Sequence, residues 1–95
     1  MSIRIPYTSE EYLTASLEGA PSDLTESTVE AALELESVDA ADVSWSTASW
    51  APGTTWPTVR WLYEGDKAKG TYVFWSRVHD SPETPVRRHD TVYLD

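Results

Sequence analysis

The sequence predicts a small all-β domain made of two packed sheets, and two observations indicate it. Several segments alternate apolar and polar residues with a period of two, which suits strands with one face in a core and one in water. Turn residues separate these segments at intervals of about ten residues. The 95 residues, with five Trp and five Tyr, suffice for one domain whose thin core is enlarged by aromatic side chains.

The first half of the chain contains three expected strands. Glu11–Leu17 alternates apolar and polar residues along its length. Thr28–Glu36 is compatible with a helix by its Glu and Ala content, but its apolar and mainly charged positions alternate, which favours a strand. A helix would also place Leu33 and Leu35 on nearly opposite sides. Val43–Trp50 is the third expected strand, and a Pro-Gly breaker follows it.

The second half contains three more expected strands. Thr58–Tyr63 and Thr71–Val78 alternate, and the polar loop Glu64–Gly70 joins them as a hairpin. Asp80–Pro85 contains two prolines and is expected to form a rigid turn before a last short strand, Thr91–Leu94. Six or seven short strands of this kind predict an immunoglobulin-like β-sandwich.

The expected domain organisation is an extended N-terminal arm, residues 1–10, followed by the sandwich, residues 11–95. The chain has no cysteine, so an intersheet disulfide is excluded and a central Trp, Trp61 or Trp75, is expected to occupy the core. The arm alternates three apolar residues and is expected to add to the sheet of a neighbouring protein through Ile3, Ile5 and Tyr7.

The formal net charge of −9 is unevenly distributed. Residues 1–50 hold ten acidic side chains and one basic, Arg4, whereas residues 51–95 hold six of each sign. This balance argues against direct binding to nucleic acid, which requires Lys and Arg against the phosphates. It fits a solvated acidic face, a basic protein partner or mimicry of nucleic acid. No apolar run approaches the roughly 18 residues of a membrane helix, so no membrane partner is expected.

The sequence contains no strong motif for catalysis, metal binding or phosphate binding. The chain is therefore expected to be non-enzymatic, with no catalytic residues and no cofactor. His79-Asp80 and His89-Asp90 place imidazole beside carboxylate, but neighbours in a strand point to opposite faces, so no metal site is expected. No serine lies in a Gly-x-Ser-x-Gly elbow, and there is no glycine-rich phosphate loop.

Aromatic residues indicate an interaction surface instead. Four Trp fall within the seventeen residues Trp45–Trp61, and a small sandwich cannot bury them all. We expect at least one of Trp50 and Trp56 to be exposed, as part of a protein interface. Packing against the core and a platform for carbohydrate remain alternatives. Arg87 and Arg88 form a basic spot, too small for nucleic acid, that suits the acidic half of a neighbouring copy.

The segment Gly70–Val86 resembles small immunoglobulin-like virion proteins of tailed bacteriophages, especially those that infect actinobacteria. In that family a Gly-x-Tyr-x-x-Trp strand leads into an Asp-x-Pro-Glu-x-Pro-Val turn, as this segment does. Ile5-Pro6-Tyr7 and the spacing of Trp45 and Trp50 also match, so the resemblance covers about half of the chain, and the turn is its most specific part.

The resemblance implies a structural role without catalytic residues. We expect a capsid decoration protein or a subunit near the head–tail connector, present in many copies that contact major capsid or connector proteins. Its expected location is the virion, and the host cytoplasm during assembly. The alternative is an acidic inhibitor or nucleic-acid mimic that presents Glu30, Glu34 and Glu36 to a host protein. A carbohydrate- or receptor-binding module is a third possibility.

Overall fold

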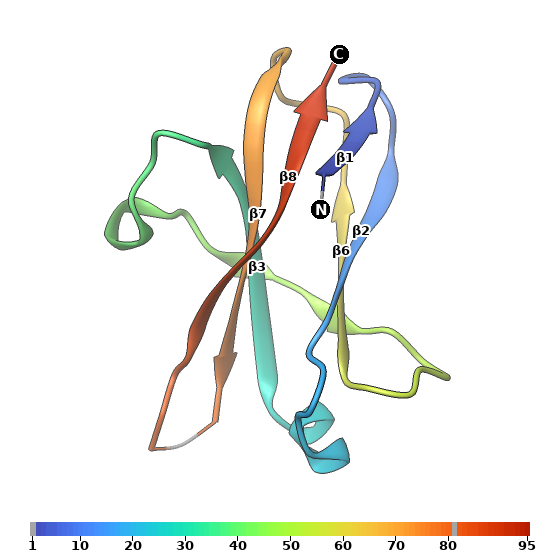
Figure 1. The fold of residues 1–95 in the computed structure, drawn as a ribbon, viewed down its shortest axis with the longest axis vertical. Helices are drawn as coiled ribbons and strands as arrows, with labels where there is room; N and C mark the ends of the chain where they lie inside the picture. The colour runs from blue at the N-terminus through green and yellow to red at the C-terminus, as the bar shows by residue number, and fades with distance from the viewer. Residues whose placement is uncertain (1, 81) are drawn as a thin grey trace.

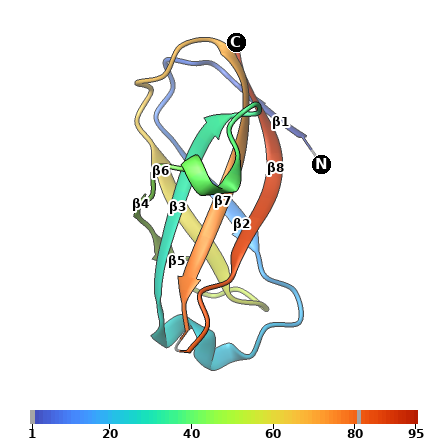
Figure 2. The same cartoon turned by 90° about the vertical axis from the view of Figure 1, so that its left-hand side faces the viewer.

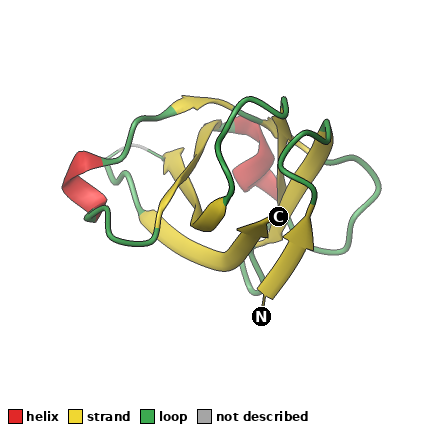
Figure 3. Ribbon diagram, turned by 90° about the horizontal axis from the view of Figure 1, so that it is seen from above, coloured by secondary structure: helices red, strands yellow, loops and turns green. Residues whose placement is uncertain are grey.

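The computed structural model describes residues 2–80 and 82–95, and these form two β-sheets packed face to face (Figures 1 and 2). One sheet has the order β1-β8-β7-β3-β4, and the other has the order β2-β6-β5. The strands are β1 (Ser2–Ile5), β2 (Glu11–Ser16), β3 (Thr28–Leu35), β4 (Ser46–Thr47), β5 (Ser49–Trp50), β6 (Thr58–Tyr63), β7 (Gly70–His79) and β8 (Val86–Leu94). Two short 3₁₀ helices, η1 (Ser22–Glu26) and η2 (Ala40–Asp42), lie outside the sheets and are red in Figure 3. The all-β expectation is confirmed.

The main core lies between the sheets and is built by the alternating residues of both. Strand β2 turns Leu13 and Ala15 inward, and β6 turns Val59 and Tyr63 inward, in full antiparallel register with β2. The five-stranded sheet closes this core from the other side, with Phe74 of β7 fully buried. The period-two patterns therefore identified the inward faces correctly.

The ambiguous segment is a strand. Thr28–Leu35 pairs with His79–Tyr72 of β7 along its whole length, so β3 is a central strand. Both of its faces are covered, because Ala31 and Leu33 point into the main core while Ala32 packs in a second cluster on the outer face. Leu35, at the end of the strand, is instead 49% exposed.

The N-terminal residues differ from the expected free arm. Strand β1 pairs in parallel with β8 of the same chain, with Ile3 opposite Val92 and Ile5 opposite Leu94. The pairing continues past the strand, where the N–H of Tyr7 donates to the Asp95 carbonyl at 3.0 Å. The physical reason is that inward-facing apolar residues of β8 lie within reach, so the alternating isoleucines bury their side chains in their own domain.

The expected strand Val43–Trp50 is divided between the two sheets. Ser46–Thr47 pairs with β3, and Ser49–Trp50 pairs with β6. Between them the N–H of Ala48 donates to the carbonyl of Val29 at 3.1 Å. The chain thus crosses from one sheet to the other and closes this side of the sandwich.

The centre of the core is occupied by Phe74 and Tyr63 and not by a Trp. Trp75 is buried on the outer face of the five-stranded sheet, because residues adjacent in β7 point to opposite faces. Trp61 packs only partly buried at the edge of the main core. At the start of β7, the Tyr72 hydroxyl donates to the carbonyl of Ala68 at 2.9 Å and ties the β6–β7 connection to the sheet.

The last strand begins earlier than Thr91 and contains a bulge. Val73 lies opposite Thr91, whereas Trp75 lies opposite Arg88, so β8 has one extra residue between these pairs. The extra residue reverses the alternation in the first half of β8. As a result, Arg87 and His89 point inward, and Arg88 points outward beside Trp75.

Candidate interaction surfaces

The residues predicted for an N-terminal contact lie mostly inside the domain. Ile5 is buried in the main core, and Ile3 and Tyr7 are partly buried against it. The Tyr7 ring is covered by Lys69, whose Nζ lies 5.3 Å from the ring centroid, and the Tyr7 carbonyl accepts a 2.5 Å hydrogen bond from the Tyr63 hydroxyl. These three side chains are therefore not arranged as a free hydrophobic arm.

The two Trp residues predicted for a contact have different environments. Trp50 is partly buried against the main core, and its indole N–H donates to the carbonyl of Ser27 at 2.9 Å. Trp56 is 41% exposed, in the loop between β5 and β6. Ser22, Thr25 and residues 51–57 line a shallow pocket of about 290 Å³ beside it. The expectation that at least one of the pair is exposed is met by Trp56.

An exposed apolar pair that the sequence-based interpretation did not select lies on the outer face of the three-stranded sheet. Tyr12 of β2 and Leu62 of β6 are register partners and are 57% and 38% exposed. The guanidinium of Arg60 lies 4.7 Å from the Tyr12 ring centroid on the same face. We call Tyr12, Arg60 and Leu62 the β2–β6 patch. The sequence could have indicated this patch, because the alternation in the two strands places the apolar residues Tyr12 and Leu62 on the side expected to face solvent.

The β2–β6 patch borders an open strand edge. Strand β2 is the last strand of its sheet, and no strand in residues 2–80 and 82–95 pairs with its other edge. The opposite edge of the same sheet is β5, which has only two residues. An unpaired edge of six residues presents backbone N–H and C=O groups to any approaching strand.

Arg87 and Arg88 lie on opposite faces of β8. The Arg88 guanidinium lies 5.8 Å from the Trp75 ring centroid on the outer face. Arg87 points inward, and together with His89 it lines a groove of about 560 Å³ against the connection that follows β2. Both arginines border this groove, but their guanidinium groups have different surroundings.

A buried polar contact lies next to Arg87. Ser76 of β7 is fully buried, and its hydroxyl lies 2.6 Å from Nε2 of His89. Burial lowers the pKa of His89, and the charge of Arg87 lowers it further, while the neighbouring Asp90 opposes both effects. His89 is accordingly favoured in its neutral form near pH 7.

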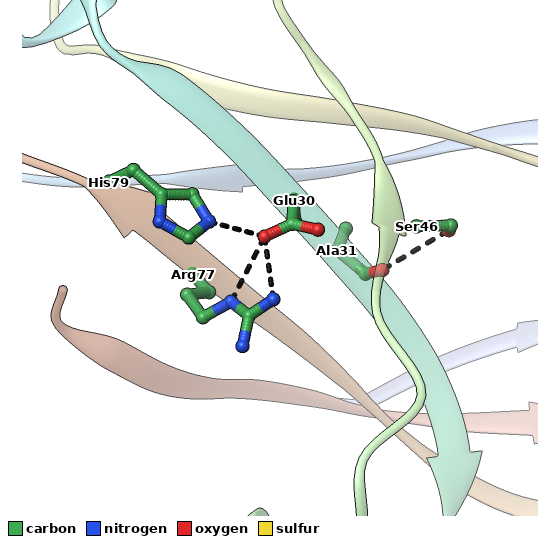
Figure 4. Close-up of polar contacts among 5 residues, drawn as sticks. All are labelled: Glu30, Ala31, Ser46, Arg77 and His79. Carbon is green, nitrogen blue, oxygen red and sulfur yellow. Dashed lines mark hydrogen bonds and ion pairs between the residues drawn. The ribbon is translucent and has the colours of Figure 1, made fainter.

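The outer face of the five-stranded sheet carries a compact polar cluster (Figure 4). Nε and Nη2 of Arg77 donate to one oxygen of Glu30 at 3.0 and 2.7 Å, and His79 contacts the same oxygen. The hydrogen bond from His79 lowers the pKa of Glu30, and the bonds from Arg77 lower it further. Trp45 stacks on this cluster, with the Arg77 guanidinium 4.6 Å from its ring centroid.

The two histidines belong to separate environments. His79 contacts Glu30 on the outer face, whereas His89 contacts Ser76 on the inner side. In the part of the chain that the structure describes, no group of three or more His, Cys, Asp or Glu residues is placed to hold a metal ion. Across the same residues, no helix has the length and apolar character needed to cross a membrane.

Comparisons with known protein families, with curated proteins and with solved structures found no match to this chain.

Proposed function

We propose that this chain is a non-enzymatic protein-interaction module that serves as a structural subunit of a tailed bacteriophage particle. It acts there as a capsid decoration protein or as a subunit of the head–tail connector region. Protein contact is supported by the geometry described above. The assignment to a virion is supported by the resemblance of Gly70–Val86 to small virion proteins.

The observation that carries the proposal is the β2–β6 patch beside an open strand edge. Exposed large apolar side chains next to each other are unfavourable in water and are typical of contact surfaces. An open edge adds backbone hydrogen bonding, so a partner strand gains main-chain bonds and side-chain burial together. Many weak copies on a symmetric lattice would gain avidity from each such contact.

We further infer an immunoglobulin-like sandwich, and two features support it. The order β2-β6-β5 corresponds to strands B, E and D of that fold, and β8-β7-β3 corresponds to G, F and C. The hydrogen bond from Tyr72 to Ala68 resembles the tyrosine corner, which lies between strands E and F. Phe74 then stands two residues later, at the position that a disulfide cysteine occupies in antibody domains.

The alternative, an acidic mimic of nucleic acid, has less support. Two of its three expected contact residues are engaged within the chain: Glu30 binds Arg77 and His79, and a carboxylate oxygen of Glu34 accepts from the N–H of Ser44 at 3.1 Å. A carboxylate held in this way is poorly placed to imitate a phosphate for a partner.

The test is to purify particles produced from the genome that encodes this chain and to measure its copy number by quantitative mass spectrometry. We expect a copy number that matches a symmetric position on the head or connector. The double variant Tyr12→Ser/Leu62→Ser should melt like the native chain yet be depleted from particles. Leu35→Ser, which changes an exposed side chain elsewhere, is the matched control. Absence of the native chain from purified particles would refute the virion role.

A further inference from the structure

The last strand, β8, has a partner along only half of its outer edge. Strand β1 pairs with Thr91–Leu94, the C-terminal part of β8. Alongside residues 86–90, no strand in the described part of the chain occupies the position that β1 would take if it were longer. The backbone edge of this half-strand is therefore open, like that of β2 on the facing sheet.

The open half-strand borders a groove between the two sheets. The groove is lined on one side by Ser16, the last residue of β2, and the next four residues, and on the other by Arg87, Arg88 and His89. Its volume is about 560 Å³, and its lining is predominantly polar. Figure 1 shows that β1 lies beside the upper, C-terminal part of β8, and that the lower part of β8 continues beyond it. The groove therefore combines open space with an unpaired backbone edge and polar side chains.

Basic side chains outnumber acidic ones in the lining, with Arg87 and Arg88 against Glu18, and Arg87 is the arginine that points inward. The bulge in β8 turns its side chain inward, opposite Ser76 in the register. Its Nη1 is buried and has no hydrogen-bond partner among the described residues. A guanidinium donor shielded from water and left without an acceptor is costly, and a carboxylate is the acceptor whose geometry matches it.

We propose that this groove binds an extended acidic segment of a partner protein, which adds as a strand beside residues 86–90 and places a carboxylate against Arg87. Because side chains alternate along a strand, the carboxylate lies on the groove-facing side, with smaller or apolar residues two positions before and after it. Strand pairing supplies backbone hydrogen bonds, and Arg87 selects for the acidic residue. The proposal rests on the proposed function as an interaction module.

The first experiment uses a capped peptide with the sequence Thr-Val-Thr-Glu-Thr-Val-Thr, and a matched peptide with Gln in place of Glu, titrated into the ¹⁵N-labelled chain. We expect saturable amide shifts within Val86–Asp90 and an affinity about tenfold higher for the Glu peptide. If millimolar Glu peptide leaves these amides unshifted, or if the two peptides bind equally, the proposal is overturned.

The second experiment assigns the preference to one residue. Arg87→Gln should remove the difference between the Glu and Gln peptides, while Arg4→Gln, which changes an exposed guanidinium outside the groove, should retain it. Amide spectra of both variants establish that the fold is intact. Retained discrimination in Arg87→Gln would overturn the role of that side chain. A concentration-dependent dimer that Arg87→Gln dissociates would identify a second copy as the occupant and refute the proposed partner.

These outcomes are separable from the proposed function. A chain that is present in purified particles but fails to bind the Glu peptide would retain its virion role and lose only this site. A chain that binds the peptide through Arg87 but is absent from particles would retain the site and lose the virion role.

Discussion

On its inner face the five-stranded sheet packs apolar side chains against a second sheet, whereas on its outer face the described residues place a loop. The inner face uses Phe74 and Val78 of β7, which are fully buried, and between them it also buries the contact of Ser76 with His89. The outer face uses Val73 and Trp75 of the same strand, covered by the connection between β3 and β4 through Val43 and by stacked arginines. One alternating strand thus supplies two cores, and the inner one holds the larger number of buried apolar side chains.

The difference between the two faces explains the positions of Arg77 and Arg88. Two packed sheets interdigitate the side chains of their inner faces and leave little space for water. A loop over a sheet leaves gaps, which are closed here by Arg77 over Trp45 and Arg88 over Trp75. Such long side chains cover apolar surface with their stems and aromatic contacts while their charged ends stay near solvent. Stability should therefore be concentrated on the inner face.

The largest effect is expected from Phe74→Ala on the inner face. Removing this fully buried ring should lower the free energy of unfolding by about 4 kcal/mol, because the cavity cannot collapse between two sheets. Urea denaturation followed by Trp fluorescence measures the loss. A change below about 2 kcal/mol would mean that the inner core is not the dominant source of stability.

A smaller effect is expected from Glu30→Gln in the outer polar cluster. The free energy of unfolding should fall by about 1.5 kcal/mol at pH 7, because the hydrogen bonds from Arg77 and His79 lose the charge of their acceptor. The pKa of Glu30 is lowered from 4.5, so its contribution is present above pH 4.5 and is lost as the pH falls through the folded-state pKa. Denaturation curves of variant and native chain should converge at low pH. Glu36→Gln, at an exposed position, is the control, and an equal loss in it would contradict the assignment.

The inner side should respond to pH in a different window, through His89. Burial lowers its folded-state pKa below 6.5, so the unfolded chain binds a proton first as the pH falls. Stability should be full above pH 6.5 and decrease below it until the folded-state pKa is passed, by at most about 1.4 kcal/mol per pH unit for one proton. Denaturation midpoints between pH 5 and 8 measure this. His89→Gln should remove this decrease of stability with falling pH, and His79→Gln should retain it. The opposite result would contradict the assignment to His89.

The smallest effect is expected from Trp75→Phe on the outer face. The indole N–H of Trp75 is buried without a partner among the described residues, so its removal offsets part of the lost packing, and we expect a change below about 0.5 kcal/mol. Trp50→Phe on the inner side is the matched variant, and it should lose about 1 kcal/mol because it breaks the bond to Ser27. Thermal unfolding of the two variants compares them, and a greater loss in Trp75→Phe would contradict the comparison.

The sequence by itself determined which side chains of the long strands point into the main core. Alternation in Glu11–Leu17, Thr28–Glu36 and Thr71–Val78 was sufficient for this, because side chains two residues apart on a strand share a face, but it did not indicate that the outer faces of β3 and β7 are covered as well. It also indicated that Trp50 and Trp56 could not both be deeply buried, and Trp56 is indeed exposed.

Tertiary structure alone decided how these strands are partnered. Ile3 and Ile5 bury against β8 of their own chain, and the segment Val43–Trp50 divides between two sheets. The bulge that turns Arg87, and not Arg88, inward depends on the pairing with β7. Alternation specifies that a strand has an inner face, but which strand it pairs with, and in what register, depends on residues far away in the sequence.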